Sequence, residues 1–210
     1  MYSSSVKLCY SSCKPGAKEV IPTLNSEEAQ PRRKLKVDLA ELEFAFENGS
    51  GEMAHYLDLE TGQVIAIADE IRRELDALYE AAWDDEAQDV SPTALANALQ
   101  GRDVPEWHQE ALREAEQVEA GYGTRYIRVP EADSHKGYRD MEAFIVTVKN
   151  KRLQDRLWRA ISGRGAFRYF KDVLMDYPSE REHWFQFKQA RLRERVLEWL
   201  ASEDIEPIEV

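Results

Sequence analysis

The sequence predicts an α+β protein: a small antiparallel three-stranded sheet, about six to seven helices and a helical C-terminal half. Short β-rich runs occur only between residues 53 and 130. Apolar residues at helical spacing dominate the chain from about Met141 onward. Hydrophobic residues make up 43% of the chain, and it holds 5 Trp, 9 Tyr and 7 Phe, which predicts a folded core.

The first residues are typical of a tail. Residues 1–34 contain three prolines and many serines without apolar periodicity, so we expect a disordered or extended tail there and a single α+β domain over 35–205. Both cysteines, Cys9 and Cys13, lie in this tail. A disulfide framework is therefore not expected, and we expect a cytoplasmic protein.

The first folded elements are a helix, a hairpin and a second helix. Asp38 is placed to cap a short helix that ends before Gly49. The runs 53–59 and 63–68 predict two strands, and Gly62 supplies the positive φ that the turn between them needs. Asp69 then begins an amphipathic helix.

The rest of the chain predicts one more strand and several helices. Two helices precede the third strand, which runs over 124–130 and ends in proline. Four amphipathic patterns follow, around Met141–Val148, 151–162, 166–176 and 179–202.

Charge is distributed unevenly along the chain. The formal net charge is −12, but residues 38–120 alone carry −18, whereas residues 121–210 carry +2. Within the latter, Lys149–Lys171 carries +7. Such a segment predicts an anionic partner, although pairing with the acidic half or simple solvation of a helix face are the alternatives.

The basic segment contains the candidate anion-binding residues. Three of its arginines are spaced i, i+4, i+7 and share a helix face, and others follow the turn at Gly163–Gly165, where glycine permits close approach of a ligand. The candidates are Arg152, Arg156, Arg159, Arg164, Arg168 and Lys171.

Aromatic residues near this segment are candidates for base stacking. Tyr169 does not fit the apolar face of its helix, and Trp184 is the second candidate. The alternative is that the aromatic cluster belongs to the core.

Several segments over about residues 35–202 carry a resemblance to a known family. They include Tyr56–Ile65, Arg125–Pro130, Gly137–Phe144 and Gly163–Asp172. Together and in this order, they resemble an uncharacterised bacterial family, family 0158 of the UPF series. The segment 84–101 matches less well, which indicates an acidic insertion. The resemblance implies no established activity, cofactor or catalytic residue.

These observations predict a non-enzymatic interaction or regulatory module that presents an arginine-rich surface to nucleic acid or an acidic protein. No catalytic, metal-binding or cofactor-binding motif occurs, and no apolar run is long enough for a membrane span. One alternative is an enzyme on nucleotides or phosphoesters, with Arg164 and Arg168 holding phosphate and Asp58 or Asp140 as base or metal ligand. Another is a homodimer whose basic face docks on the acidic half of its partner.

Overall fold

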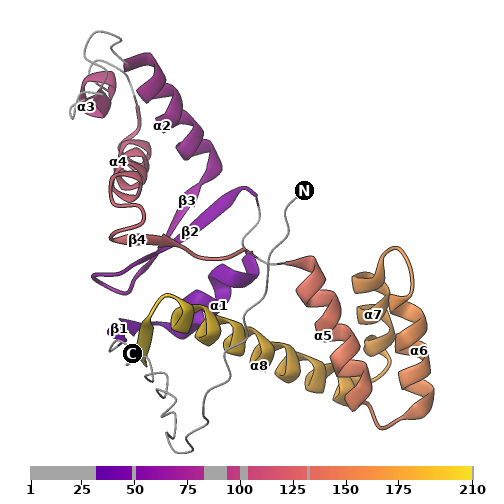
Figure 1. Ribbon diagram of the computed structural model, residues 1–210. Coiled ribbons are helices and arrows are strands. Elements are labelled where there is room, and N and C mark those ends of the chain that lie inside the picture. Colours follow the sequence, from indigo (N-terminus) through magenta and orange to yellow (C-terminus); the bar gives the residue numbers. More distant parts are fainter. Residues whose placement is uncertain (1–31, 49–50, 83–93, 100–103, 132, 210) are drawn as a thin grey trace, which may run out of the picture. The chain divides into compact units, whose positions relative to one another are not determined.

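The computed structural model describes residues 32–48, 51–82, 94–99, 104–131 and 133–209 (Figure 1). Most of the expected tail and most of the segment 84–101 lie outside these residues. Within the described part of the chain, no helix is long and apolar enough to cross a membrane.

The predicted antiparallel sheet is confirmed. It has the order β3-β2-β4, so the central strand β2 pairs with both neighbours. Leu57 of β2 is fully buried and lies opposite Val64 of β3 and Ile127 of β4. The strands are β2 (Met53–Asp58), β3 (Val64–Ala68) and β4 (Tyr126–Arg128).

The turn between β2 and β3 depends on Gly62. Its φ is +76°, as the hairpin pattern predicted. A Cβ at this position would lie 1.8 Å from the carbonyl oxygen of Lys36. The turn therefore needs glycine both for its backbone angle and for its close approach to the backbone of Lys36.

A second, two-stranded sheet was not predicted. Strand β1 (Arg33–Val37) pairs in parallel with β5 (Ile205–Glu209), and it includes Arg33 and Lys34, which the sequence assigned to the tail. β1 is short and mostly charged, and its partner is far away in the sequence. Local pattern does not reveal such a strand, because long-range pairing decides its conformation.

The described residues hold eight helices, against the six to seven expected. One of them begins earlier than predicted, at Ser134, because the Asp133 carboxylate accepts a hydrogen bond from the backbone N–H of His135 at 2.8 Å. The helices are α1 (Leu39–Asn48), α2 (Asp69–Ala82), α3 (Ala94–Leu99), α4 (Glu106–Ala120), α5 (Ser134–Thr147), α6 (Lys151–Ile161), α7 (Ala166–Met175) and α8 (Pro178–Ser202).

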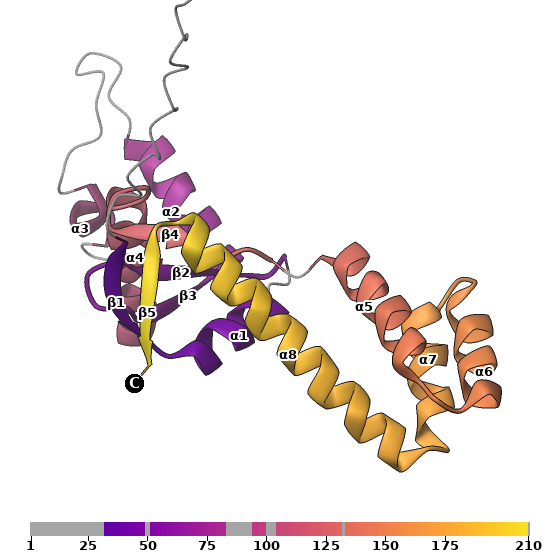
Figure 2. The same ribbon diagram turned by 60° about the horizontal axis from the view of Figure 1, so that its bottom comes forward.

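The long helix α8 contributes to two hydrophobic clusters. Near its C-terminus, Leu192, Val196 and Leu200 pack with β1, β5 and α1. Near its N-terminus, Trp184 packs with α5, α6 and α7. Figure 2 shows α8 passing alongside α1 and then reaching α5 and α7. A third cluster joins the antiparallel sheet to α2, α3 and α4.

Candidate anion-binding groove

Helices α6 and α7 carry the basic segment and pack through their apolar faces. Leu153, Leu157 and Ile161 of α6 are buried, as are Phe170 and Leu174 of α7. With one apolar face buried, the remaining faces of each helix turn outward. The local sequence thus places the arginines of α6 on the surface.

The turn between the two helices depends on Gly165. Its φ is +80°, and it precedes α7 without any side-chain cap. A Cβ there would lie 3.2 Å from Cε2 of Tyr169. The glycine therefore allows the tyrosine ring to lie against the turn.

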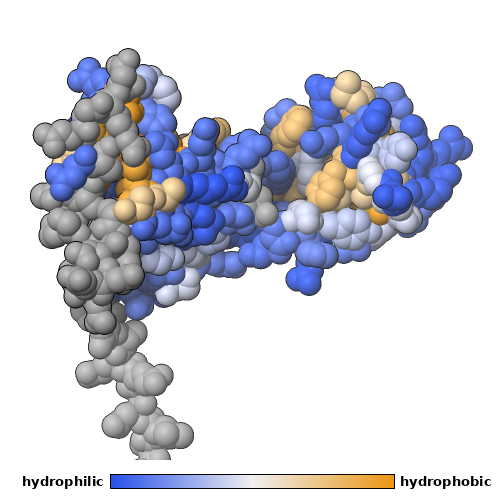
Figure 3. All heavy atoms as spheres, turned by 90° about the horizontal axis from the view of Figure 1, so that it is seen from above, coloured by the Kyte–Doolittle hydropathy of each residue, from blue (hydrophilic) through white to orange (hydrophobic). Residues whose placement is uncertain are grey.

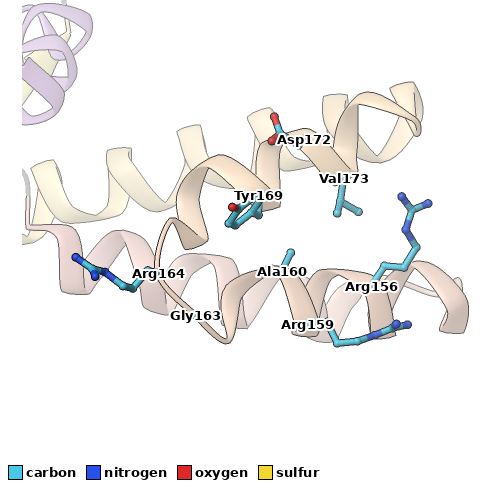
Figure 4. Close-up of a pocket in the computed structure, with 8 residues that line it drawn as sticks. All are labelled: Arg156, Arg159, Ala160, Gly163, Arg164, Tyr169, Asp172 and Val173. Atoms are coloured by element: carbon cyan, nitrogen blue, oxygen red, sulfur yellow. The ribbon is translucent and has the colours of Figure 1, made fainter.

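Between α6 and α7 lies a groove with a cavity volume of about 530 Å³. In Figure 4, Ala160 and Val173 point into the space between the helices, and Tyr169 lies beside them. Arg156 and Arg164 extend at opposite ends of this space. The full lining is Arg156, Arg159, Ala160, Gly163, Arg164, Tyr169, Asp172 and Val173.

Arg156 is held in place by its neighbours. Its Nη2 lies 3.1 Å from Oδ2 of Asp176, and its Nη1 donates a hydrogen bond of 3.2 Å to the hydroxyl of Tyr177. Its guanidinium lies 5.6 Å from the centre of the Tyr177 ring. Hydrogen bonds to Asp176 and Tyr177 raise the pKa of Arg156, so it stays charged.

The other groove arginines have no acidic partner in the described part of the chain. Arg159 donates a hydrogen bond of 3.1 Å to the backbone carbonyl of Asp155. Arg164 makes no hydrogen bond or ion pair with any other described residue. Both charges are therefore available to an external group.

The remaining predicted cations lie outside the groove lining. Arg168 is exposed, and its Nε lies 3.9 Å from Oδ2 of Asp172 one helical turn away. Arg152 and Lys171 are exposed. Among the described residues, none of the six candidates pairs with an acid of the segment 38–120.

The two stacking candidates have opposite environments. Tyr169 is 55% exposed and lies in the groove, whereas Trp184 is only 7% exposed. The ring of Trp184 contacts Phe144, Phe170 and Phe187 at centroid distances of 5.1, 4.8 and 6.2 Å. The prediction that Trp184 stacks on a base was wrong, because its ring is covered by the core.

Figure 3 shows apolar patches on the surface at the right of the view, in the part of the molecule that holds α5, α6 and α7.

Comparison with known proteins assigns the family. The model of the uncharacterised protein family UPF0158 matches residues 102–209, a range that includes the whole groove. A relative from Pseudomonas aeruginosa strain PAO1, UPF0158 protein PA5073, is 30% identical over 176 residues, which is 83% of this chain and 88% of the relative. The chain belongs to UPF0158. No solved structure matches it.

Asp58, one of the acids in the enzyme alternative, is buried in this UPF0158 protein. Nε and Nη2 of Arg125 donate to its two carboxylate oxygens at 3.1 and 2.8 Å, and the backbone N–H of Glu60 donates at 2.8 Å. Burial acts to raise the pKa of Asp58, but the hydrogen bonds from Arg125 and Glu60 outweigh it and lower the pKa to about 2. The carboxylate therefore joins β2 to the start of β4.

Asp140, the other candidate acid, is also buried. It accepts hydrogen bonds from Nη2 of Arg195 and, at 3.4 Å, from Nε of Arg191. Arg195 and Asp140 also line a second cavity of about 350 Å³, between α1, α5 and α8. Within the described residues, no group of three or more His, Cys, Asp or Glu is placed to hold a metal ion.

Sequence reasoning missed the arginines of α8. Glu43 of α1 is buried and is contacted by Gln189 and by Arg193, the latter at 3.4 Å. Arg191 and Arg195 are spaced i, i+4, which places them on one face of α8 toward Asp140. That spacing was the available signal, but only the fold brings the buried carboxylate beside it.

Proposed function

We propose that this UPF0158 protein is an interaction module whose α6–α7 groove binds an anionic partner. The main support for this proposal is that Arg159 and Arg164 line the groove without an acidic partner among the described residues. Arg156 adds a third charge at the opposite end from Arg164. Arginine suits this role, because it stays charged and donates in pairs to phosphate or carboxylate.

The enzyme alternative receives less support from the acids that it would use. The groove that contains Arg164 is lined by neither Asp58 nor Asp140, and each of those carboxylates is already bound to arginine. A base or metal ligand is less available when its oxygens accept several hydrogen bonds. We therefore favour binding without catalysis.

The test is charge reversal in the groove. A variant with Arg156→Glu, Arg159→Glu and Arg164→Glu should lose binding to inorganic polyphosphate, measured by calorimetry at low salt. Its matched control reverses three exposed cations outside the groove, Arg113, Lys136 and Arg139. Equal loss in both variants, or no loss in either, contradicts the proposal.

The homodimer alternative has its own test. If the basic face docks on the acidic half of a second copy, the protein should dimerise at low salt and dissociate as salt rises. Light scattering across a salt series measures this directly. A monomer at every salt concentration excludes that dimer and leaves the groove accessible to other partners.

A further inference from the structure

The groove combines an apolar centre with a cationic rim. Ala160 and Val173 point into its centre, beside the exposed ring of Tyr169. The charges of Arg156 and Arg164 lie at its two ends. A ligand that matches this surface needs a flat apolar part flanked by anionic groups.

The positions of the arginines also limit the ligand. Arg156 and Arg164 point to opposite ends of the groove, and Arg159 lies on the side of α6 away from α7. One phosphate group does not contact guanidinium groups that diverge in this way. A chain with repeated negative charges can place a separate charge at each arginine.

We propose that the occupant is single-stranded nucleic acid, with a base stacked on Tyr169 and separate phosphates along the same strand bound by Arg159 and Arg164. This inference rests on the proposed function and names its partner class. Proteins that bind single strands combine a cationic groove along the backbone with aromatic rings on which bases stack. Tyr169 supplies such a ring, and its 55% exposure leaves it accessible.

Duplex and acidic protein fit the surface less well. A duplex presents phosphate over a broad face, and domains that bind it usually have a pI above about 9, whereas this chain has a pI of about 4.9. An acidic protein supplies carboxylates but no flat base for Tyr169. Asp172 is the acid in the groove lining, and its carboxylate points away from α6.

The experiment compares probes that differ in one feature each. Fluorescence anisotropy would measure binding of a labelled single strand of about 12 nucleotides, in RNA and DNA forms. The comparison probes are an abasic strand of the same length, the corresponding duplex and a polyglutamate peptide. The variants are Tyr169→Leu, which keeps apolar bulk without an aromatic face, and the triple Arg→Glu variant described above.

We expect both single strands to bind more tightly than the abasic strand, the duplex and polyglutamate. Tyr169→Leu should weaken single-strand binding about tenfold, and leave abasic binding unchanged, because one base–aromatic stack is lost. The tighter of the RNA and DNA forms identifies the sugar that the groove prefers. The triple Arg→Glu variant should bind neither strand.

Two results would overturn the inference, and they are distinguishable. In the first result, the abasic strand or polyglutamate binds as tightly as the single strands, and its affinity falls in the triple Arg→Glu variant but not in Tyr169→Leu. The partner is then an anion without bases. The proposed function then stands and the nucleic-acid assignment fails. If no probe binds, or the triple variant binds all probes like wild type, both fail.

Discussion

The arginines of α8 and those of the α6–α7 groove differ in what they contact. Arg191 and Arg195 of α8 bind the buried carboxylate of Asp140 on α5. Arg159 and Arg164 of the groove contact no carboxylate of the described residues. Both regions are arginine-rich helical segments, so composition does not separate them. The comparison teaches that a buried acidic partner distinguishes a structural arginine from one available for binding.

The largest expected difference concerns the aromatic residues of the two environments. Trp184→Ala should lower the free energy of unfolding by about 4 kcal/mol, because it removes a buried ring from the hydrophobic cluster that α5, α6, α7 and α8 form. Tyr169→Ala should change it by less than about 1 kcal/mol, because that ring is exposed. Denaturant unfolding of the two variants measures both values. Equal losses would show that Tyr169 is a core residue and would remove it from the binding surface.

The next prediction compares two acids beside arginines. Asp140→Ala should lower the free energy of unfolding by about 3 kcal/mol, because the partly buried Arg195 loses its carboxylate. Asp172→Ala should cost less than about 1 kcal/mol, since it breaks only an exposed contact with Arg168. Thermal and denaturant unfolding test both. The contrast between the two regions is wrong if the Asp140 variant is as stable as the Asp172 variant.

The sequence predicted the antiparallel sheet and the basic helices well, because these depend on local signals. Two β-rich runs on either side of Gly62 define the hairpin, and the i, i+4, i+7 spacing places Arg152, Arg156 and Arg159 on one helix face. The pairing of β1 with β5 and the burial of Asp140 were missed. Each depends on a partner from a distant part of the chain, and local pattern carries no information on it.

The candidate site was predicted in part for the same reason. Tyr169 departs from the apolar face of α7 and is exposed, as the helical spacing indicated. Trp184 lies on the same stripe of α8 as the other buried residues of that helix, because it precedes Leu192 by two steps of four residues. That spacing was the available signal for its burial, and the fold shows which core cluster covers it.

A smaller effect is expected from pH. The pKa of Asp58 is about 2 in the folded protein against an ordinary value of 3.8. The ionised carboxylate therefore makes its full contribution to the free energy of unfolding above about pH 4, and this contribution is lost as the pH falls toward 2. We expect the free energy of unfolding to fall by at most about 2 kcal/mol over this range. Solvent screening makes the loss smaller, because the partner Arg125 is half exposed.

The measurement for Asp58 is urea unfolding between pH 2 and 6. Asp58→Asn should be less stable at pH 6 and should flatten the dependence below pH 4. Glu60→Gln, which changes a more exposed partner of Arg125, is the matched control and should keep the wild-type profile. An unchanged profile in Asp58→Asn would mean that other carboxyl groups dominate the acid response.

The smallest stability effect is expected in the groove itself. Arg164→Ala should change the free energy of unfolding by no more than about 0.5 kcal/mol, because the side chain is exposed and makes no hydrogen bond or ion pair with any other described residue. Chemical denaturation provides the value. A larger loss would mean that Arg164 stabilises the fold, and its role at the surface would need another explanation.

The most direct test of the central claim is the salt dependence of single-strand binding. If Arg156, Arg159 and Arg164 each bind a phosphate, the plot of log K against log salt should have a slope of about −2. Arg164→Ala should make this slope shallower by about 0.7, whereas Arg139→Ala should leave it unchanged. A slope that is the same in wild type and Arg164→Ala would contradict the account, because the groove arginines would then not contact the anion.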